Sequence, residues 1–217
     1  MGQSMHRTFG WLLGAGVMLA AAGCNIVGPA YLLIHGPEKT PAQFQPDKKR
    51  PTIVFVDDRA NVLPRRALRQ QIAAAAQNTL LKEGVLVDVI DAGAAMNVAA
   101  HETAGQPMDI VSLTKAARAE IMIYVQVDSF YLTPDGQTFS PQAKFHVKVI
   151  DVTKPEPRVW PPEREGKAVS VEMKPANIAA PKTLTEQMSA LSALADRSGT
   201  RIAQLFFSHE TRDELAN

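Results

Sequence analysis

The chain has 217 residues, of which 46% are hydrophobic, so it is long enough for one domain with a substantial core. Its 23 basic and 22 acidic residues nearly cancel, which argues against a nucleic-acid-binding protein, because neutralising phosphates requires a basic face. A single cysteine, Cys24, excludes a disulfide within the chain.

Residues 1–23 have the pattern of a secretory signal peptide. Arg7 gives a positive start, and the 14 residues 9–22 carry no charge. This apolar run is shorter than the roughly 20 residues that a membrane-spanning helix needs, and glycines interrupt it. We therefore expect residues 1–23 to be removed on export, which leaves 22 basic and 22 acidic residues.

Cys24 stands directly after this apolar run. The stretch Ala21-Ala22-Gly23-Cys24 resembles the lipobox of bacterial lipoproteins, although Ala21 takes the place of the usual leucine. The resemblance implies that the Cys24 sulfur receives a diacylglycerol and that Cys24 becomes the first mature residue; the alternative is an incidental free thiol. Two or three acyl chains, at about 0.8 kcal/mol per buried methylene, anchor a protein firmly. Asn25, where an aspartate would indicate inner-membrane retention, favours the outer membrane.

Residues 24–51 are predicted to form an extended tether. They contain five prolines and two glycines, which prevent a continuous helix or strand. The apolar run 30–35 can rest on the membrane surface or on the domain. The basic cluster 48–50 is interpreted as a solvated boundary, with a site for anionic headgroups as the alternative.

A folded domain is predicted over residues 52–208. Residues 52–56 are β-branched or aromatic, which indicates a strand buried on both faces. A helix over residues 61–82 is expected to end at Gly84, and residues 85–90 are expected to form a second short strand.

The second half of the domain is predicted to contain a meander between two helices. A helix over residues 107–118 has Asp109 as a plausible N-cap, and the final helix begins with the capping box Thr183 to Glu186. Gly199 is expected to weaken that helix by about 1 kcal/mol relative to alanine. The remaining segments are the strands 120–131, 143–152 and 166–173, the first two joined by a Pro-Asp-Gly turn, and a polar tail over residues 209–217.

The order β-α-β-α-β-β-β-α places the domain in the α/β (α+β) class. It predicts a mixed β-sheet with helices packed on it, preceded by the signal peptide and the tether.

The sequence contains no motif typical of an enzyme. The junction after the first strand has no glycine-rich loop for phosphates, the histidines are scattered, and the SxxK pattern at Ser112 lacks its companion segments. Asp57 and Asp58 can pair as acid and base or bind a hard cation, although an Asp pair after a strand more often caps a turn. We therefore expect no catalytic residue, no metal and no cofactor.

Four aromatic residues are candidates for a partner-binding site. They lie around the Pro-Asp-Gly turn or in the next connection: Phe130, Tyr131, Phe139 and Trp160. Such side chains often act as anchors at interfaces if they gather at one end of a meander. Covering the sheet edge or the core is the alternative role.

The lipobox, the tether and the domain together look like a group of bacterial envelope lipoproteins. The domain resemblance is carried by TIVFVDD (52–58), the helix and strand 65–90, the block 109–130 and AKFHVKVIDVT (143–153). The group includes the penicillin-binding-protein activator LpoB, the curli secretion lipoprotein CsgG and, for the domain alone, the amino-terminal domain of TolB.

This resemblance implies a non-catalytic partner-binding or assembly module. Acylated Cys24 would hold it in a lipid bilayer of the cell envelope, facing the periplasm and most simply at the outer membrane, and its partner would be an envelope protein or polysaccharide. One alternative is a subunit of an oligomeric secretion pore, but the segment 131–142, the candidate for a spanning hairpin, contains two prolines and Asp135. The other alternative is a periplasmic hydrolase that uses Asp57 or Asp58.

Overall fold

The computed structural model of the chain describes residues 38–94, 109–173 and 180–210. Cys24, the predicted signal peptide and the first part of the predicted tether lie outside this range. Within it, no helix combines the length and the apolar character needed to cross a membrane.

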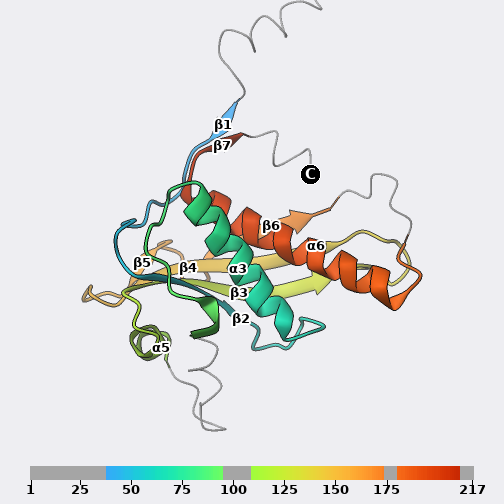
Figure 1. Ribbon diagram of the computed structural model, residues 1–217, viewed down its shortest axis with the longest axis horizontal. Helices are drawn as coiled ribbons and strands as arrows, with labels where there is room; N and C mark the ends of the chain where they lie inside the picture. Colours follow the sequence, from blue (N-terminus) through green and yellow to red (C-terminus); the bar gives the residue numbers. More distant parts are fainter. Residues whose placement is uncertain (1–37, 95–108, 174–179, 211–217) are drawn as a thin grey trace, which may run out of the picture. The chain divides into compact units, whose positions relative to one another are not determined.

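A mixed five-stranded β-sheet forms the centre of the domain (Figure 1). Its first two strands are parallel, and the other pairs are antiparallel. The strands are β2 (Thr52–Asp57), β3 (Ile121–Tyr131), β4 (Gln142–Asp151), β5 (Arg158–Trp160) and β6 (Lys167–Glu172). Two short outer strands lie on the same side of β4: β6 pairs with its first half, and β5 pairs with the part near its end.

Helices cover the sheet unequally on its two faces. One face is covered by α3 (Ala67–Lys82) and α6 (Leu184–Ala203), and η2 (Gln204–Phe206) follows α6. The opposite face packs against the short α5 (Ile110–Ala116). A mixed sheet with helices packed on it confirms the predicted fold class.

The compact unit that contains this sheet runs from Pro41 to His209. Residues 41–51, which the sequence assigned to the tether, lie within it: the backbone N–H of Gln43 donates to the carbonyl of Leu205 at 2.8 Å. The strands β1 (Lys39–Thr40) and β7 (His209–Glu210) form a separate two-stranded sheet.

One predicted strand does not form, and three short strands, β1, β5 and β7, were not predicted. Residues 85–90 make only an isolated bridge, between Val89 and Thr52. The reason is that the N–H of Val87 donates to the carbonyl of Lys48, and the side chain of Val87 is 62% exposed. β5 pairs with β4 although its three residues are too few to show a period. The predicted capping residues Asp109 and Thr183 do cap α5 and α6.

Arg50 joins three segments at the end of the sheet where β2 begins. Its guanidinium donates to Glu120 at 2.7 Å and, through two nitrogens, to the Asp151 carboxylate at 2.6 and 2.8 Å. These hydrogen bonds hold the pKa of Asp151, whose side chain is 6% exposed, well below its usual range. Arg50 therefore has a structural role, which differs from the solvated boundary predicted for residues 48–50.

α6 packs directly on α3 at Gly199. A Cβ at this position would lie 2.4 Å from the carbonyl oxygen of Ile72 and 2.6 Å from the Cβ of Ala75. Beside this contact, the side-chain amide of Gln71 donates to Asp196 of α6 at 2.9 Å. The expectation that Gly199 merely weakens its helix is therefore incomplete, because the glycine permits the two backbones to approach.

We expect Gly199→Ala to lower the free energy of unfolding by about 1–3 kcal/mol, although alanine is the better helix former. The added methyl group would push α6 away from α3, since two of the three atoms it meets belong to the backbone. Urea unfolding of the purified protein measures the change. Gln187→Ala, at an exposed position of the same helix, is the control and should have little effect. A Gly199→Ala variant as stable as the wild type would contradict the packing argument.

We expect Asp151→Asn to lower the free energy of unfolding by about 3 kcal/mol at pH 7, because Arg50 loses its charged partner. The pKa of Asp151 is lower in the folded chain than its ordinary value of 3.8, so its stabilisation is present above that pH and is lost as the pH falls through the folded pKa. The difference in free energy of unfolding between the wild type and Asp151→Asn should therefore become smaller below about pH 4, as urea titrations would measure. Asp88→Asn, on an exposed side chain, is the control. A gap that stays constant with pH would show that Asp151 does not act through its charge.

Candidate functional site

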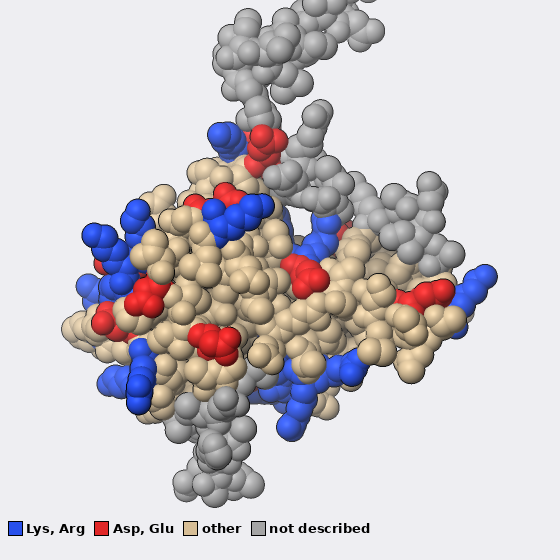
Figure 2. Space-filling model, in the orientation of Figure 1, with Lys and Arg blue, Asp and Glu red and all other residues tan. Residues whose placement is uncertain are grey.

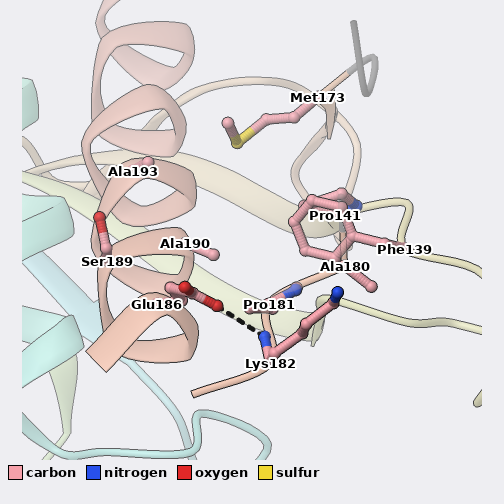
Figure 3. A pocket seen from close by; sticks show the side chains of 10 residues that line it. All are labelled: Phe139, Pro141, Met173, Ala180, Pro181, Lys182, Glu186, Ser189, Ala190 and Ala193. Carbon is pink, nitrogen blue, oxygen red and sulfur yellow. Dashed lines mark hydrogen bonds between the residues drawn. The ribbon is translucent and has the colours of Figure 1, made fainter. Parts of the chain in front are cut away.

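A pocket of about 510 Å³ lies between the first half of α6 and the ends of β4 and β6 (Figure 3). This volume is in the range of pockets that hold small molecules or a partner's side chain. Its lining is mainly apolar and consists of Phe139, Pro141, Met173, Ala180, Pro181, Lys182, Glu186, Ser189, Ala190 and Ala193.

One wall of the pocket is a flank of α6. Glu186, Ala190 and Ala193 recur at helical spacing and share this flank, which faces away from the contact with α3 at Gly199. The small methyl groups of Ala190 and Ala193 leave room where larger side chains would fill the space. The first turns of α6 also expose apolar surface, since Leu184 is 73% and Met188 41% exposed.

The opposite wall comes from the sheet. Pro141 directly precedes β4 and Met173 directly follows β6, and the N–H of Met173 donates to the carbonyl of Pro141 at 3.0 Å. Phe139 comes from the β3–β4 connection, where the Asp135 carboxylate accepts the N–H of Thr138. Hydrogen bonds from the hydroxyl and the N–H of Thr138 lower the pKa of Asp135 to about 2. The turn is thereby fixed and holds the nearly buried Phe139 in the wall.

Two charged residues lie at the start of α6. The Glu186 carboxylate accepts the N–H of Lys182 at 2.7 Å and that of Thr183 at 3.2 Å, and these two hydrogen bonds lower its pKa. This arrangement confirms the predicted capping box and commits Glu186 to the helix start. The ammonium group of Lys182 forms no hydrogen bond or ion pair with the residues that the structure describes. It is therefore available to a ligand at the pocket.

The distribution of charge does not identify a site on the face of the domain that α3 and α6 cover. Figure 2 shows Lys and Arg side chains interspersed with Asp and Glu, with broad uncharged areas between them. A patch of one sign, which would attract nucleic acid or an anionic membrane surface, is not visible on this face. The apolar pocket is therefore the more informative feature.

The four predicted partner-binding aromatics are not brought together. Phe130 is buried in the core, Tyr131 is 49% exposed, and Phe139 lines the pocket. Trp160 pairs with Val149 of β4, whereas Phe130 pairs with Ala143 of the same strand. These two partners are six residues apart, which is about 20 Å along β4. Trp160 packs on Phe44 and Phe206, with ring centroids 5.8 and 6.0 Å away, which is the predicted alternative of covering the core.

The alanines of α6 that line the pocket were not predicted from the sequence. A pocket wall made of small side chains has no motif, and only the repeated small residues on one flank could have indicated it.

Asp57 and Asp58 do not share a site. Successive strand residues point to opposite faces. Asp57 accepts hydrogen bonds from Tyr124, in the core cluster that contains α5, and from Arg59 at 2.7 Å. Burial and the bond to Asp57 raise the pKa of Tyr124.

Asp58 lies on the other face, where its carboxylate accepts the N–H groups of Val62 and Leu63 at 2.8 and 3.1 Å. Asp58 therefore caps the turn before α3, which was one of the predicted alternatives. Because this turn comes first, α3 begins at Ala67 and not at the predicted residue 61. The two carboxylates thus do not form the acid–base pair that a hydrolase using both of them would need.

Other candidate reactive groups also have local partners. The hydroxyl of Ser112, from the SxxK pattern, donates to Asp109 at 2.5 Å within the N-cap of α5. Nδ1 of His146 lies 2.5 Å from Asp128, and the two residues come from adjacent strands. Across residues 38–94, 109–173 and 180–210, no cluster of three or more His, Cys, Asp or Glu could hold a metal ion.

Comparisons with known proteins find likenesses among solved structures and no family. No family model matches the chain, and no curated protein matches it. The PelC dodecamer from Paraburkholderia phytofirmans is 14% identical, with 77% of this chain and 91% of that chain covered and a TM-score of 0.43. Lipoprotein GNA1162 from Neisseria meningitidis is 12% identical, with 68% and 95% covered and a TM-score of 0.37. The hypothetical protein CT253 from Chlamydia trachomatis is 14% identical, with 72% and 98% covered and a TM-score of 0.38.

Proposed function

We propose that this protein is a lipid-anchored, non-catalytic accessory module of the cell envelope, which binds a protein partner through the pocket beside α6. The observation that carries the proposal is the apolar pocket itself, which is already formed in the isolated chain. Its walls are fixed by the capping box of α6 and by the Asp135 turn. The pocket that the described residues form can therefore receive a ligand group without rearrangement of these walls.

The chemistry of the lining favours a protein over a polysaccharide partner. Sugar rings need several hydrogen-bonding groups, whereas most of this lining is Ala, Pro, Met and Phe. Of its polar residues, Glu186 is already bonded to the helix start. An apolar side chain of a protein partner fits such a lining best, since burying it removes apolar surface from water.

The anchoring part of the proposal rests on the sequence alone. Cys24 follows an uncharged run and stands in a lipobox-like stretch, so acylation there would hold the domain at a membrane. We place the domain on the periplasmic side of the outer membrane, because Asn25 replaces the aspartate of inner-membrane retention.

We expect Cys24→Ser to abolish labelling by radioactive palmitate and to release the protein from the membrane pellet, because no other cysteine can accept the diacylglycerol. Asn25→Ser, next to the modified position, is the control and should leave labelling intact. Label incorporation and sedimentation with membrane vesicles measure the outcome. Unlabelled wild-type protein, or Cys24→Ser protein that still sediments, would contradict the anchor.

We expect Ala190→Trp to reduce recovery of the partner by about tenfold or more, since an indole in the pocket occupies the partner's place. The matched control is Ala116→Trp, on an exposed alanine of α5 at the other face of the sheet. The measurement is quantitative mass spectrometry of proteins purified with each variant from solubilised membranes, with thermal unfolding to verify the fold. Equal recovery with Ala190→Trp and Ala116→Trp would exclude the pocket as the binding site.

A further inference from the structure

We infer that the partner presents an extended polypeptide segment, which pairs with the outer edge of β6, unpaired among the described residues, and places one apolar side chain in the pocket. This inference rests on the proposed function and specifies the kind of ligand. It comes from a second feature of the molecule, the edge of the sheet beside the pocket.

β6 is one of the two outer strands of the sheet on the side opposite β2, the other being β5 (Figure 1). It pairs with β4 in a regular antiparallel register, Gln142 opposite Glu172 through Val147 opposite Lys167. No other strand among the described residues pairs with it. An edge of this kind is a template for one more strand.

The direction of the free backbone groups follows from one hydrogen bond. The N–H of Met173 donates to Pro141, in register with the β4–β6 ladder, so odd-numbered residues of β6 bond to β4. The N–H and C=O groups of Ala168, Ser170 and Glu172 therefore point away from β4. All three of these residues are exposed.

The middle of the β6 edge lacks the usual protection against strand addition. Natural edges carry prolines, bulges or charged side chains, and β6 has charges only at its two ends, Lys167 and Glu172. Between Lys167 and Glu172, β6 reads Ala-Val-Ser-Val, and its register with β4 has no shift. The opposite edge differs, because the start of β2 is bonded to the segment 88–90: Thr52 N–H to Asp88 at 3.2 Å and Ile90 N–H to Thr52 at 2.9 Å.

The pocket continues this edge on the helix-covered face. Met173 follows β6 directly and lines the pocket, and Val169 and Val171 of β6 are buried on the same face. A strand added beside β6 would direct every second side chain to that face, where the flank of α6 with Ala190 and Ala193 forms the far wall (Figure 3). Backbone pairing would then supply affinity and the pocket would supply specificity, as in other strand-addition complexes.

The free edge distinguishes a polypeptide from other apolar ligands. A fatty-acyl chain could fill the pocket but has no N–H or C=O groups to pair with Ala168 and Ser170. The Lys182 ammonium group adds a charge preference, because it can pair with an acidic residue that flanks the inserted side chain. The expected ligand is therefore an extended segment with one large apolar residue beside an acidic residue.

The test uses the full-length protein in intact cells, with the photo-crosslinker p-benzoylphenylalanine in place of Ser170 at the edge or of Lys182 at the pocket rim. The inference predicts that both positions crosslink to one continuous segment of the same partner protein. Crosslinks from Lys182 alone would overturn strand addition and leave the proposed function standing. Crosslinks to lipid or to a second copy of the chain would overturn the inference, and no crosslink at either position would overturn the proposed function as well.

Two substitutions at Ser170 give a second, quantitative test. Ser170→Pro removes one outward N–H but no bond to β4, and proline is tolerated at such edge positions, so partner recovery should fall about tenfold. Ser170→Ala keeps the N–H and should leave recovery unchanged. Ala168→Pro repeats the test if Ser170→Pro fails to fold, as thermal unfolding would reveal. Unchanged recovery with a folded proline variant would overturn the pairing.

Discussion

The close approach of α6 to α3 at Gly199 determines where the open surface of this domain lies. With no side chain at Gly199, the second half of α6 is held against α3, and Leu194 and Ile202 are fully buried in the core. The opposite flank of α6 then faces the ends of β4 and β6 without touching another helix among the described residues. The pocket is thus a consequence of the packing of α6 on α3, because α6 cannot move toward the pocket without losing the contact at Gly199.

Local signals in the sequence predicted most of the sheet and the capped starts of α5 and α6, but not the start of α3. β4, β6 and the second half of β3 alternate apolar and polar residues, which is a property of neighbouring positions. The caps Asp109 and Thr183 act within one helical turn. Residues 85–90 have the composition of a strand, but a hydrogen bond to Lys48 decides their path. That bond joins segments far apart in the chain, so no local pattern could reveal it.

The candidate site was predictable only in part, and for the same reason. Phe139 was identified because an aromatic beside a strong turn stands out, whereas the wall of α6 consists of alanines that carry no signal alone. Trp160 was grouped with Phe130 because both follow the meander in sequence, but the register of β5 on β4 places them far apart. Asp58 shows the opposite case, since its capping role is local and was among the predicted alternatives.

The bonds around Arg50 and Gln43 have a mechanical consequence. A chain held at Cys24 would transmit any pull on the anchor along the backbone toward β2. Before that force reached the sheet, it would have to break the hydrogen bond between Gln43 and Leu205 and then the two hydrogen bonds between Arg50 and Asp151. Tension along the chain would therefore load the hydrogen bonds of Gln43, Lys48 and Arg50 before it stretched β2.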